Sequence, residues 1–320
     1  MCEFDSQPSS DQPSKPPRSQ PGRLEARLRA SEFAVVCEMS PPRGASIEPL
    51  RRKAALVEGW VDAAVVTDGQ GAQTRMAGWA GCLAVKAEGV EPVMLLQGRD
   101  RNRLALQADL LGAAGASIPN VLLQTGDHAA AGDHPEAAES FDLDSLAAIR
   151  AATNMKQHRQ LMSGRELSAA PHWFIGCVEN ATSDDPRRVQ RFEAKVEAGA
   201  QFVLTQYVFD LQRFEAWMRQ VRDRGLDQRC YVLAGVGPVL TPGALRFLER
   251  LGDVHIPEAT ARSMRDLPEN ELATAGMALA VETLQALHAM PGVAGAYLLT
   301  SNHEQVVPEL MTRAGIPSRQ

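Results

Sequence analysis

The stretch Asn120-Val-Leu-Leu-Gln-Thr-Gly-Asp127 is a short apolar run that ends abruptly in polar residues. A run of this length, followed by turn-forming residues, is typical of a strand buried on both faces. The segment 101–112 before it carries apolar residues at helical spacing, and the Ser117-Ile-Pro119 turn leads from that segment into the strand. The sequence therefore predicts a helix and then a buried strand with a carboxylate, Asp127, at its C-terminal tip.

The same alternation continues through the chain. Apolar runs predict eight strands, at residues 33–37, 63–67, 92–96, 121–125, 173–177, 202–206, 231–235 and 295–299. Helical periodicity predicts helices at about residues 47–58, 73–88, 101–115, 143–155, 186–199, 210–224, 242–251 and 267–289, with a short extra piece at 254–258. Eight β/α alternations in a chain of this length favour an α/β fold of the (β/α)₈ TIM-barrel type.

A doubly wound open sheet is the alternative fold. It usually has a glycine-rich phosphate turn after its first strand, but here the first strand is followed by Glu38-Met-Ser-Pro-Pro-Arg-Gly44. The cluster Ala234-Gly-Val-Gly-Pro238 lacks a third glycine and meets a proline where a helix should begin. The dinucleotide-binding pattern of an open sheet is therefore poorly matched.

Composition narrows the class of protein further. Residues 1–24 are rich in Ser, Pro, Gln and Asp and are expected to form a disordered tail, which leaves residues 25–320 as one barrel domain. A formal net charge of −6 argues against a nucleic-acid-binding protein. The five cysteines are scattered without a C-x-x-C pair, and no apolar window predicts a membrane span or signal peptide. We expect a cytoplasmic protein, of a size that often forms homo-oligomers.

Polar residues follow most of the predicted strands. They are Glu38, Thr67-Asp68, Gln97, Asp127, Asn180, Gln206 and Thr300-Ser301-Asn302-His303. Because TIM barrels build their sites at the C-terminal ends of the strands, these side chains should meet at one mouth. Such a set suits proton transfer and the recognition of a neutral heterocycle better than phosphate capture. Glu38, between an apolar strand and Pro41-Pro42, is a candidate general acid with a raised pKa, although a turn or cap role is open for it and for Asp127.

A metal centre is a second hypothesis for this mouth. Asp127-His128 and Asp133-His134 supply two acid and imidazole pairs of the ligand types that zinc and iron prefer. An ordered loop over the mouth is the simpler interpretation, since the residues between the pairs are flexible and no second ligand cluster follows another strand. Ser163 and Ser301 show no His and Asp arrangement for serine catalysis.

Five segments form a pattern beyond these local signals. They are Cys37-Glu-Met-Ser-Pro-Pro-Arg43, Val66-Thr-Asp-Gly69 with Thr74-Arg-Met76, residues 99–112, residues 120–127, and residues 195–210. In these segments the chain resembles the methylenetetrahydrofolate reductase family, in order from about residue 30 to residue 315. The resemblance implies a (β/α)₈ barrel that binds FAD at the strand C-termini and moves a hydride between the flavin and the one-carbon unit of tetrahydrofolate. It also implies NADH, NADPH or an electron-donor protein as the source of electrons.

The resemblance implies roles for particular residues. Glu38 matches the general acid that protonates the bridging nitrogen of 5,10-methylenetetrahydrofolate. Asp127 matches the aspartate beside the flavin and the pterin, and Gln206 matches the glutamine that hydrogen-bonds the folate. The positions that contact FAD in the family are Thr67, Gly126, Asp127, Phe141 and Lys195, with Lys195 suited to the phosphates. Leu95, Thr125, Val178 and His303 depart from the side chains that many members carry.

Several functions stay open on the sequence alone. The enzyme could supply methyl groups for methionine biosynthesis or run towards methylene folate in methyl-group catabolism. A metal-dependent barrel lyase or hydrolase would use the Asp127 and Asp133 pairs. A non-catalytic folate-binding subunit is a third class, which Glu38 argues against because a pure binder needs no ring-opening acid.

Overall fold

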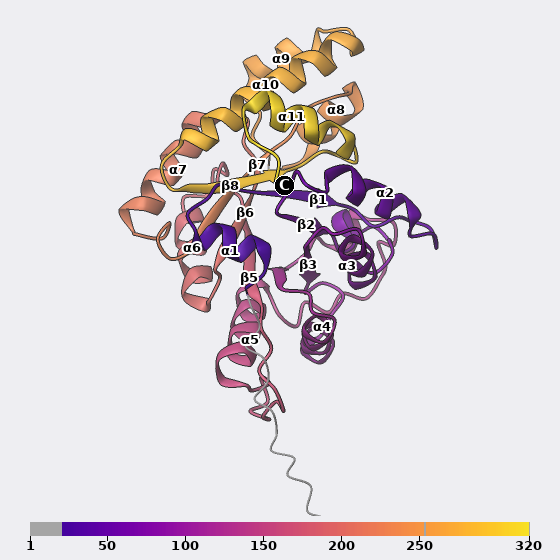
Figure 1. The fold of residues 1–320 in the computed structure, drawn as a ribbon, viewed down its shortest axis with the longest axis vertical. Helices are drawn as coiled ribbons and strands as arrows, with labels where there is room; N and C mark the ends of the chain where they lie inside the picture. The colour runs from indigo at the N-terminus through magenta and orange to yellow at the C-terminus, as the bar shows by residue number, and fades with distance from the viewer. Residues whose placement is uncertain (1–20, 253, 320) are drawn as a thin grey trace, which may run out of the picture.

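The computed structural model describes residues 21–252 and 254–319. Eight parallel strands form a closed barrel in chain order, and helices surround it (Figure 1). The strands are β1 (Ala34–Met39), β2 (Ala63–Val66), β3 (Pro92–Gln97), β4 (Asn120–Gln124), β5 (Phe174–Glu179), β6 (Phe202–Tyr207), β7 (Tyr231–Val236) and β8 (Val293–Leu298). The predicted TIM barrel is confirmed, and every predicted strand overlaps an observed one.

The helices follow the strands as the periodicity predicted, with additions. They are α1 (Arg23–Arg29), α2 (Glu48–Val57), α3 (Gly78–Ala87), α4 (Arg103–Gly115), α5 (Ser145–His158), α6 (Arg188–Ala198), α7 (Leu211–Asp223), α8 (Pro242–Arg250), α9 (Glu258–Arg265), α10 (Glu269–Ala289) and α11 (Val307–Ala314). Short 3₁₀ turns are η1 (Gln70–Ala72), η2 (Ala129–Ala131) and η3 (Glu304–Val306). The sequence did not predict α1, α9 or α11. Among the described residues, none of these helices has the length and apolar character needed to cross a bilayer.

Side-chain caps fix where several helices begin. The Asn102 side chain accepts hydrogen bonds from two backbone N–H groups of the first turn of α4, each at 3.0 Å. Asp144 caps α5 through the N–H of Ala147 at 2.8 Å, and Asp210 caps α7 through the N–H of Arg213 at 2.9 Å. These caps satisfy N–H groups that a helix leaves without partners, and they set the entry of each helix after its strand.

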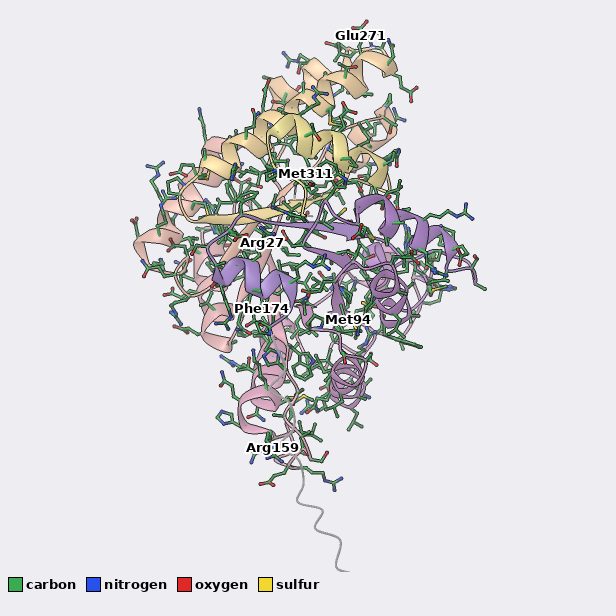
Figure 2. The ribbon with its side chains drawn as sticks, in the orientation of Figure 1. Arg27, Met94, Arg159, Phe174, Glu271 and Met311 are labelled. Atoms are coloured by element: carbon green, nitrogen blue, oxygen red, sulfur yellow. The ribbon has the colours of Figure 1, made fainter. Side chains whose placement is uncertain are left out.

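The barrel interior is packed with alternate residues of the strands. Phe174 and Phe202 stack inside it with ring centroids 4.9 Å apart. Gly176 permits this packing, because a Cβ there would lie only 2.2 Å from the Phe202 ring. Side chains fill the space between the strands and the surrounding helices (Figure 2). The interior is therefore a solid core, and a ligand must bind at one of its ends.

Helix α1 closes the N-terminal end of the barrel. Leu24 and Leu28 are buried and pack with the interior residues of the strands. The expected tail of residues 1–24 therefore ends too late, since the barrel domain includes Arg23 and Leu24, whereas residues 1–20 lie outside the described residues. The sequence did not predict α1 because the helix is only seven residues long, carries three arginines and follows a polar segment.

Candidate functional site

Glu38 stands at the C-terminal end of β1 and faces the barrel interior. Ala34 and Val36 belong to the interior core, and Glu38 follows them at the two-residue spacing of one strand face. Its side chain is half-buried, and the Tyr297 hydroxyl of β8 donates a hydrogen bond to Glu38 Oε2 at 2.5 Å. The candidate acid thus lies at the mouth and is held by a side chain from the neighbouring strand.

The surroundings of Glu38 favour its protonated form. Burial raises the pKa of Glu38 above its ordinary value, and hydrogen bonds from Tyr297 and Gln70 oppose that rise. The nearby Glu304 raises the pKa further, while Arg75 lowers it. A carboxyl group whose pKa is raised in this way holds a proton nearer neutral pH, as a general acid requires.

The loops after β1 and β2 are joined beside Glu38. Arg75 donates from Nη1 to the Pro41 carbonyl at 3.0 Å, and the Met76 N–H donates to the Pro42 carbonyl at 3.0 Å. Thr67, buried at the end of β2, donates from Oγ1 to Ser40 Oγ at 3.3 Å. These bonds hold the two loops against each other beside Glu38.

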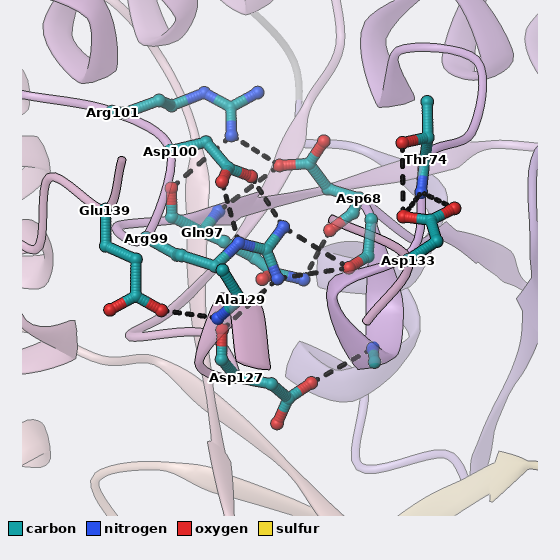
Figure 3. A network of polar contacts seen from close by, with 12 residues as sticks. Asp68, Thr74, Gln97, Arg99, Asp100, Arg101, Asp127, Ala129, Asp133 and Glu139 are labelled. Atoms are coloured by element: carbon teal, nitrogen blue, oxygen red, sulfur yellow. Dashed lines mark hydrogen bonds and ion pairs between the residues drawn. The ribbon is translucent and has the colours of Figure 1, made fainter. Parts of the chain in front are cut away.

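Asp127 lies in the loop after β4 and is exposed. Its Oδ2 accepts a hydrogen bond from the backbone N–H of Gly71 at 3.0 Å (Figure 3). Gly126 before it has φ of +96°, and a Cβ there would lie 2.5 Å from Gln97 Oε1. Glycine is therefore required at this position to turn the chain and present the Asp127 carboxylate.

A buried ionic network braces the loops of β2, β3 and β4 (Figure 3). Arg101 pairs with Asp68 at 2.5 Å and with Asp109 at 2.6 Å. Arg99 donates to the carbonyls of Gly69 and Asp127, each at 3.3 Å. Sequence reasoning placed Asp68 at the mouth but missed both arginines, whose signal was the charged segment directly after the third strand. The network supports the site by fixing the backbone that carries Asp127.

The proposed metal ligands are used for other bonds. Asp133 accepts from the backbone N–H of Thr74 at 3.0 Å, and His128 Nδ1 lies 3.1 Å from Glu139 Oε2. Across residues 21–252 and 254–319, no group of three or more His, Cys, Asp or Glu side chains is arranged to hold a metal ion. These bonds fit an ordered loop over the mouth, which was the simpler interpretation of the sequence.

The remaining candidate residues divide between the mouth and the outer wall. Phe141, with φ of +38°, packs edge-on against His128 with ring centroids 4.9 Å apart. Gln206 is half-buried near the end of β6, at a register irregularity of the β6–β7 pair. Lys195 of α6 instead donates to the Val178 carbonyl at 2.6 Å and to Glu179 Oε2 at 2.8 Å. Its ammonium group is thus engaged between helix α6 and strand β5.

The arrangement defines a class of protein, a TIM barrel whose polar strand tips and inward carboxyl group meet at the C-terminal mouth. The family model of methylenetetrahydrofolate reductase matches residues 23–315, and the chain therefore belongs to the methylenetetrahydrofolate reductase family.

Relatives with curated names agree with this family. The chain is 25% identical over 126 residues to a probable methylenetetrahydrofolate reductase (NADPH) of Caenorhabditis elegans, an alignment covering 39% of this chain and 19% of the relative. It is 25% identical over 130 residues to methylenetetrahydrofolate reductase 2 of Saccharomyces cerevisiae, covering 40% and 21%. These alignments span about a fifth of each relative.

A solved structure shares the fold. It is an uncharacterized protein from Clostridium thermocellum that binds two copies of 5-methyl-5,6,7,8-tetrahydrofolic acid. The TM-score is 0.64 at 12% sequence identity, covering 91% of this chain and 99% of that one. At this identity the likeness concerns the fold alone.

Proposed function

We propose that the protein is a flavin-dependent oxidoreductase that interconverts 5,10-methylenetetrahydrofolate and 5-methyltetrahydrofolate. Membership of the family and the names of the relatives support this activity. The observation that carries it is Glu38, a half-buried carboxyl group with a raised pKa at the mouth of the barrel. The folate bound by the Clostridium thermocellum protein of the same fold supports the substrate class.

Glu38 supplies the proton in the reductive direction. Protonated Glu38 gives its proton to N10 of the methylene folate, the bond from the bridging carbon to N10 breaks, and an N5 iminium ion forms. A hydride added to that carbon then yields the N5 methyl group. In the oxidative direction the Glu38 carboxylate takes the proton back from N10 as the ring closes. One carboxyl group thus serves both directions, and its protonation state favours one of them at a given pH.

Asp127 and Gln206 are proposed to act on the folate. The exposed Asp127 carboxylate provides negative charge where the iminium cation develops, and its hydrogen bond to the Gly71 N–H holds it in place. The half-buried Gln206 amide can both donate to and accept from the pterin. These groups orient a heterocycle without a cluster of cations.

The residues at the mouth fit the flavin end of FAD better than its phosphate end. Gly126 turns the chain beside Asp127, Thr67 follows directly after β2, and Phe141 lies between η2 and α5, so these four residues would hold the cofactor. When bound, FAD supplies the hydride to the one-carbon unit. Lys195 fits less well, because Glu179 and the Val178 carbonyl already bind its ammonium group. Its proposed contact with the phosphates would require that ion pair to open.

The test is the variant Glu38→Gln assayed with both folates. We expect folate turnover to fall by about 10²-fold or more, as for loss of a general acid, while flavin binding is retained. NADH, NADPH and a reduced protein are offered in turn as electron donors. Turnover that is unchanged in the variant would refute the role of Glu38. If the parent protein binds folate but shows no turnover with any of these donors, the non-catalytic folate-binding subunit is favoured instead.

A further inference from the structure

Tyr297 of β8 donates a hydrogen bond to Glu38 of the neighbouring strand β1 from inside the barrel. The register of the β1–β8 pair places Tyr297 beside Val36, one pleat below Glu38 on the inward face. The phenol therefore spans the step of two residues along β1 to donate to Glu38 Oε2 at 2.5 Å. Tyr297 is 6% exposed, so its hydroxyl group reaches the acid from within the core and not from the solvent.

We propose that Tyr297 is the positioning residue of Glu38, and that it sets the pH range in which Glu38 exchanges its proton. The inference rests on the proposed function of Glu38 as the acid. Nothing in the strand-tip pattern or the family resemblance assigned Tyr297 a role. Its hydroxyl group acts through Glu38 and need not touch the folate.

The physical basis is a charge-assisted hydrogen bond. A hydroxyl group that donates to a carboxylate at this distance stabilises the ionised form of the acid. Burial has the opposite effect on Glu38, and the Tyr297 bond limits that effect. Because Oε2 accepts the phenol proton, the transferable proton is directed to Oε1. Tyr297 thus fixes both the readiness of Glu38 to ionise and the oxygen atom that serves the folate.

Tyr297 is suited to this role because it stays neutral. Burial and the neighbouring Glu38 charge raise the pKa of the phenol well above its ordinary value. The hydroxyl group therefore remains a donor at every pH at which the enzyme would work. A phenylalanine would leave the packing intact and remove only the donor.

Other groups also act on Glu38 and define the background of the test. The groups that interact electrostatically or by hydrogen bonds with Glu38 or with its neighbours are Gln70 of η1, Arg75 after η1, Glu304 of η3 with its partner Lys53 of α2, Cys37 of β1 and Tyr207 of β6. None of them is changed by Tyr297→Phe. A shift in the titration of Glu38 in that variant would therefore report the loss of the one hydroxyl group.

Tyr207 provides a matched control. It is 7% exposed, and its hydroxyl group donates to the Leu299 carbonyl at 2.9 Å and lies 3.2 Å from Ser301 Oγ. Tyr207→Phe thus removes a similarly buried hydroxyl group from the same interior without removing a bond to Glu38. A general effect of losing a core hydroxyl group should appear equally in both variants.

The experiment is an infrared titration of the Glu38 carboxyl band, identified by its loss in Glu38→Gln. We expect Tyr297→Phe to move the midpoint upwards by about 1 to 2 pH units, and Tyr207→Phe by much less. The alkaline limb of the reductive rate should move with it. An unchanged midpoint in Tyr297→Phe, or an equal shift in both variants, would overturn the proposal. Turnover retained in Glu38→Gln would instead refute the proposed function, while the titration still measures the coupling.

A second experiment strengthens the hydrogen bond from Tyr297 instead of removing it, and it keeps the proposal testable if Tyr297→Phe folds poorly. The chain has three tyrosines, Tyr207, Tyr231 and Tyr297, so fluorotyrosine can be incorporated throughout in a Tyr207→Phe, Tyr231→Phe background. Fluorination makes the phenol a stronger donor. The Glu38 midpoint should then fall relative to the unlabelled double variant, and a rise or no change would contradict the role of Tyr297.

Discussion

Lys195 Nζ lies 2.8 Å from Glu179 Oε2, and this ion pair joins helix α6 to the end of strand β5. Glu179 is only 4% exposed, and Arg191 of the same helix contacts its other oxygen at 3.1 Å. Removing one partner of a buried carboxylate strongly destabilises the folded protein. The pair therefore anchors α6 to the barrel, whatever else Lys195 does.

We predict that Lys195→Met lowers the free energy of unfolding by about 2 to 3 kcal/mol, less than a full loss because Arg191 remains. Flavin affinity should change little, because the Lys195 ammonium group of the parent protein is bound to Glu179. Denaturant unfolding and flavin fluorescence titration measure the two effects. Lys86→Met is the control, since exposed Lys86 donates only to the carbonyls of Ala116 and Ser117. A tenfold loss of flavin affinity with unchanged stability would show instead that Lys195 contacts the phosphates.

Glu38→Gln should increase stability at alkaline pH. The native pKa of Glu38 lies above its ordinary value, so between those two values the native state holds more protons than the unfolded state. Stability of the parent protein therefore falls as the pH rises through that window, and the variant escapes this loss. We expect a Tm higher by about 1 to 2 °C at pH 8 and a difference near zero at pH 4. Glu309→Gln, at an exposed position, is the control, and its Tm difference should not depend on pH. A Glu38→Gln variant that is less stable than the parent protein at pH 8 would contradict the cost of burying the Glu38 carboxylate.

Gly126→Ala should distort the mouth. The alanine would have to adopt φ of +96°, and its Cβ would meet Gln97 Oε1 at 2.5 Å. We expect a cost of about 1 to 3 kcal/mol together with weaker flavin and folate binding. Gly112→Ala is the counterpart, because Gly112 lies inside α4 and a Cβ there would have no atom within 4 Å. This variant should have a free energy of unfolding higher by about 0.5 to 1 kcal/mol. Equal stability changes in the two variants, measured by urea unfolding, would refute the argument.

Asp62 should be important for closing the barrel. It is fully buried, accepts a hydrogen bond from the Val35 N–H at 2.7 Å, and pairs with Arg27 of α1 and with Arg319 at 3.3 Å. We predict that Asp62→Ala lowers the free energy of unfolding by about 3 kcal/mol or more, because two arginines lose a buried ionic contact and the buried Val35 N–H loses its acceptor. In Arg313→Ala, which breaks only a surface pair with Glu309, the change should stay below about 1 kcal/mol.

The sequence predicted the barrel because its strands are short apolar runs separated by helix-period segments. It predicted the position of Glu38 because TIM barrels build their sites from the residues that follow each strand, and Glu38 follows the first apolar run. Tyr297 escaped that rule since it lies inside β8, and only the β1–β8 register brings its hydroxyl group to Glu38. Lys195 shows the opposite limit, because a motif gives a position but not the partner that holds the side chain.

The most direct test of the proposed function is an anaerobic titration of the flavin-loaded protein with 5-methyltetrahydrofolate, following the absorbance band of the oxidised flavin. We predict that the band bleaches as the methyl group is oxidised, and that it bleaches far more slowly in Glu38→Gln. A protein that retains its flavin and binds the folate without bleaching would contradict the account.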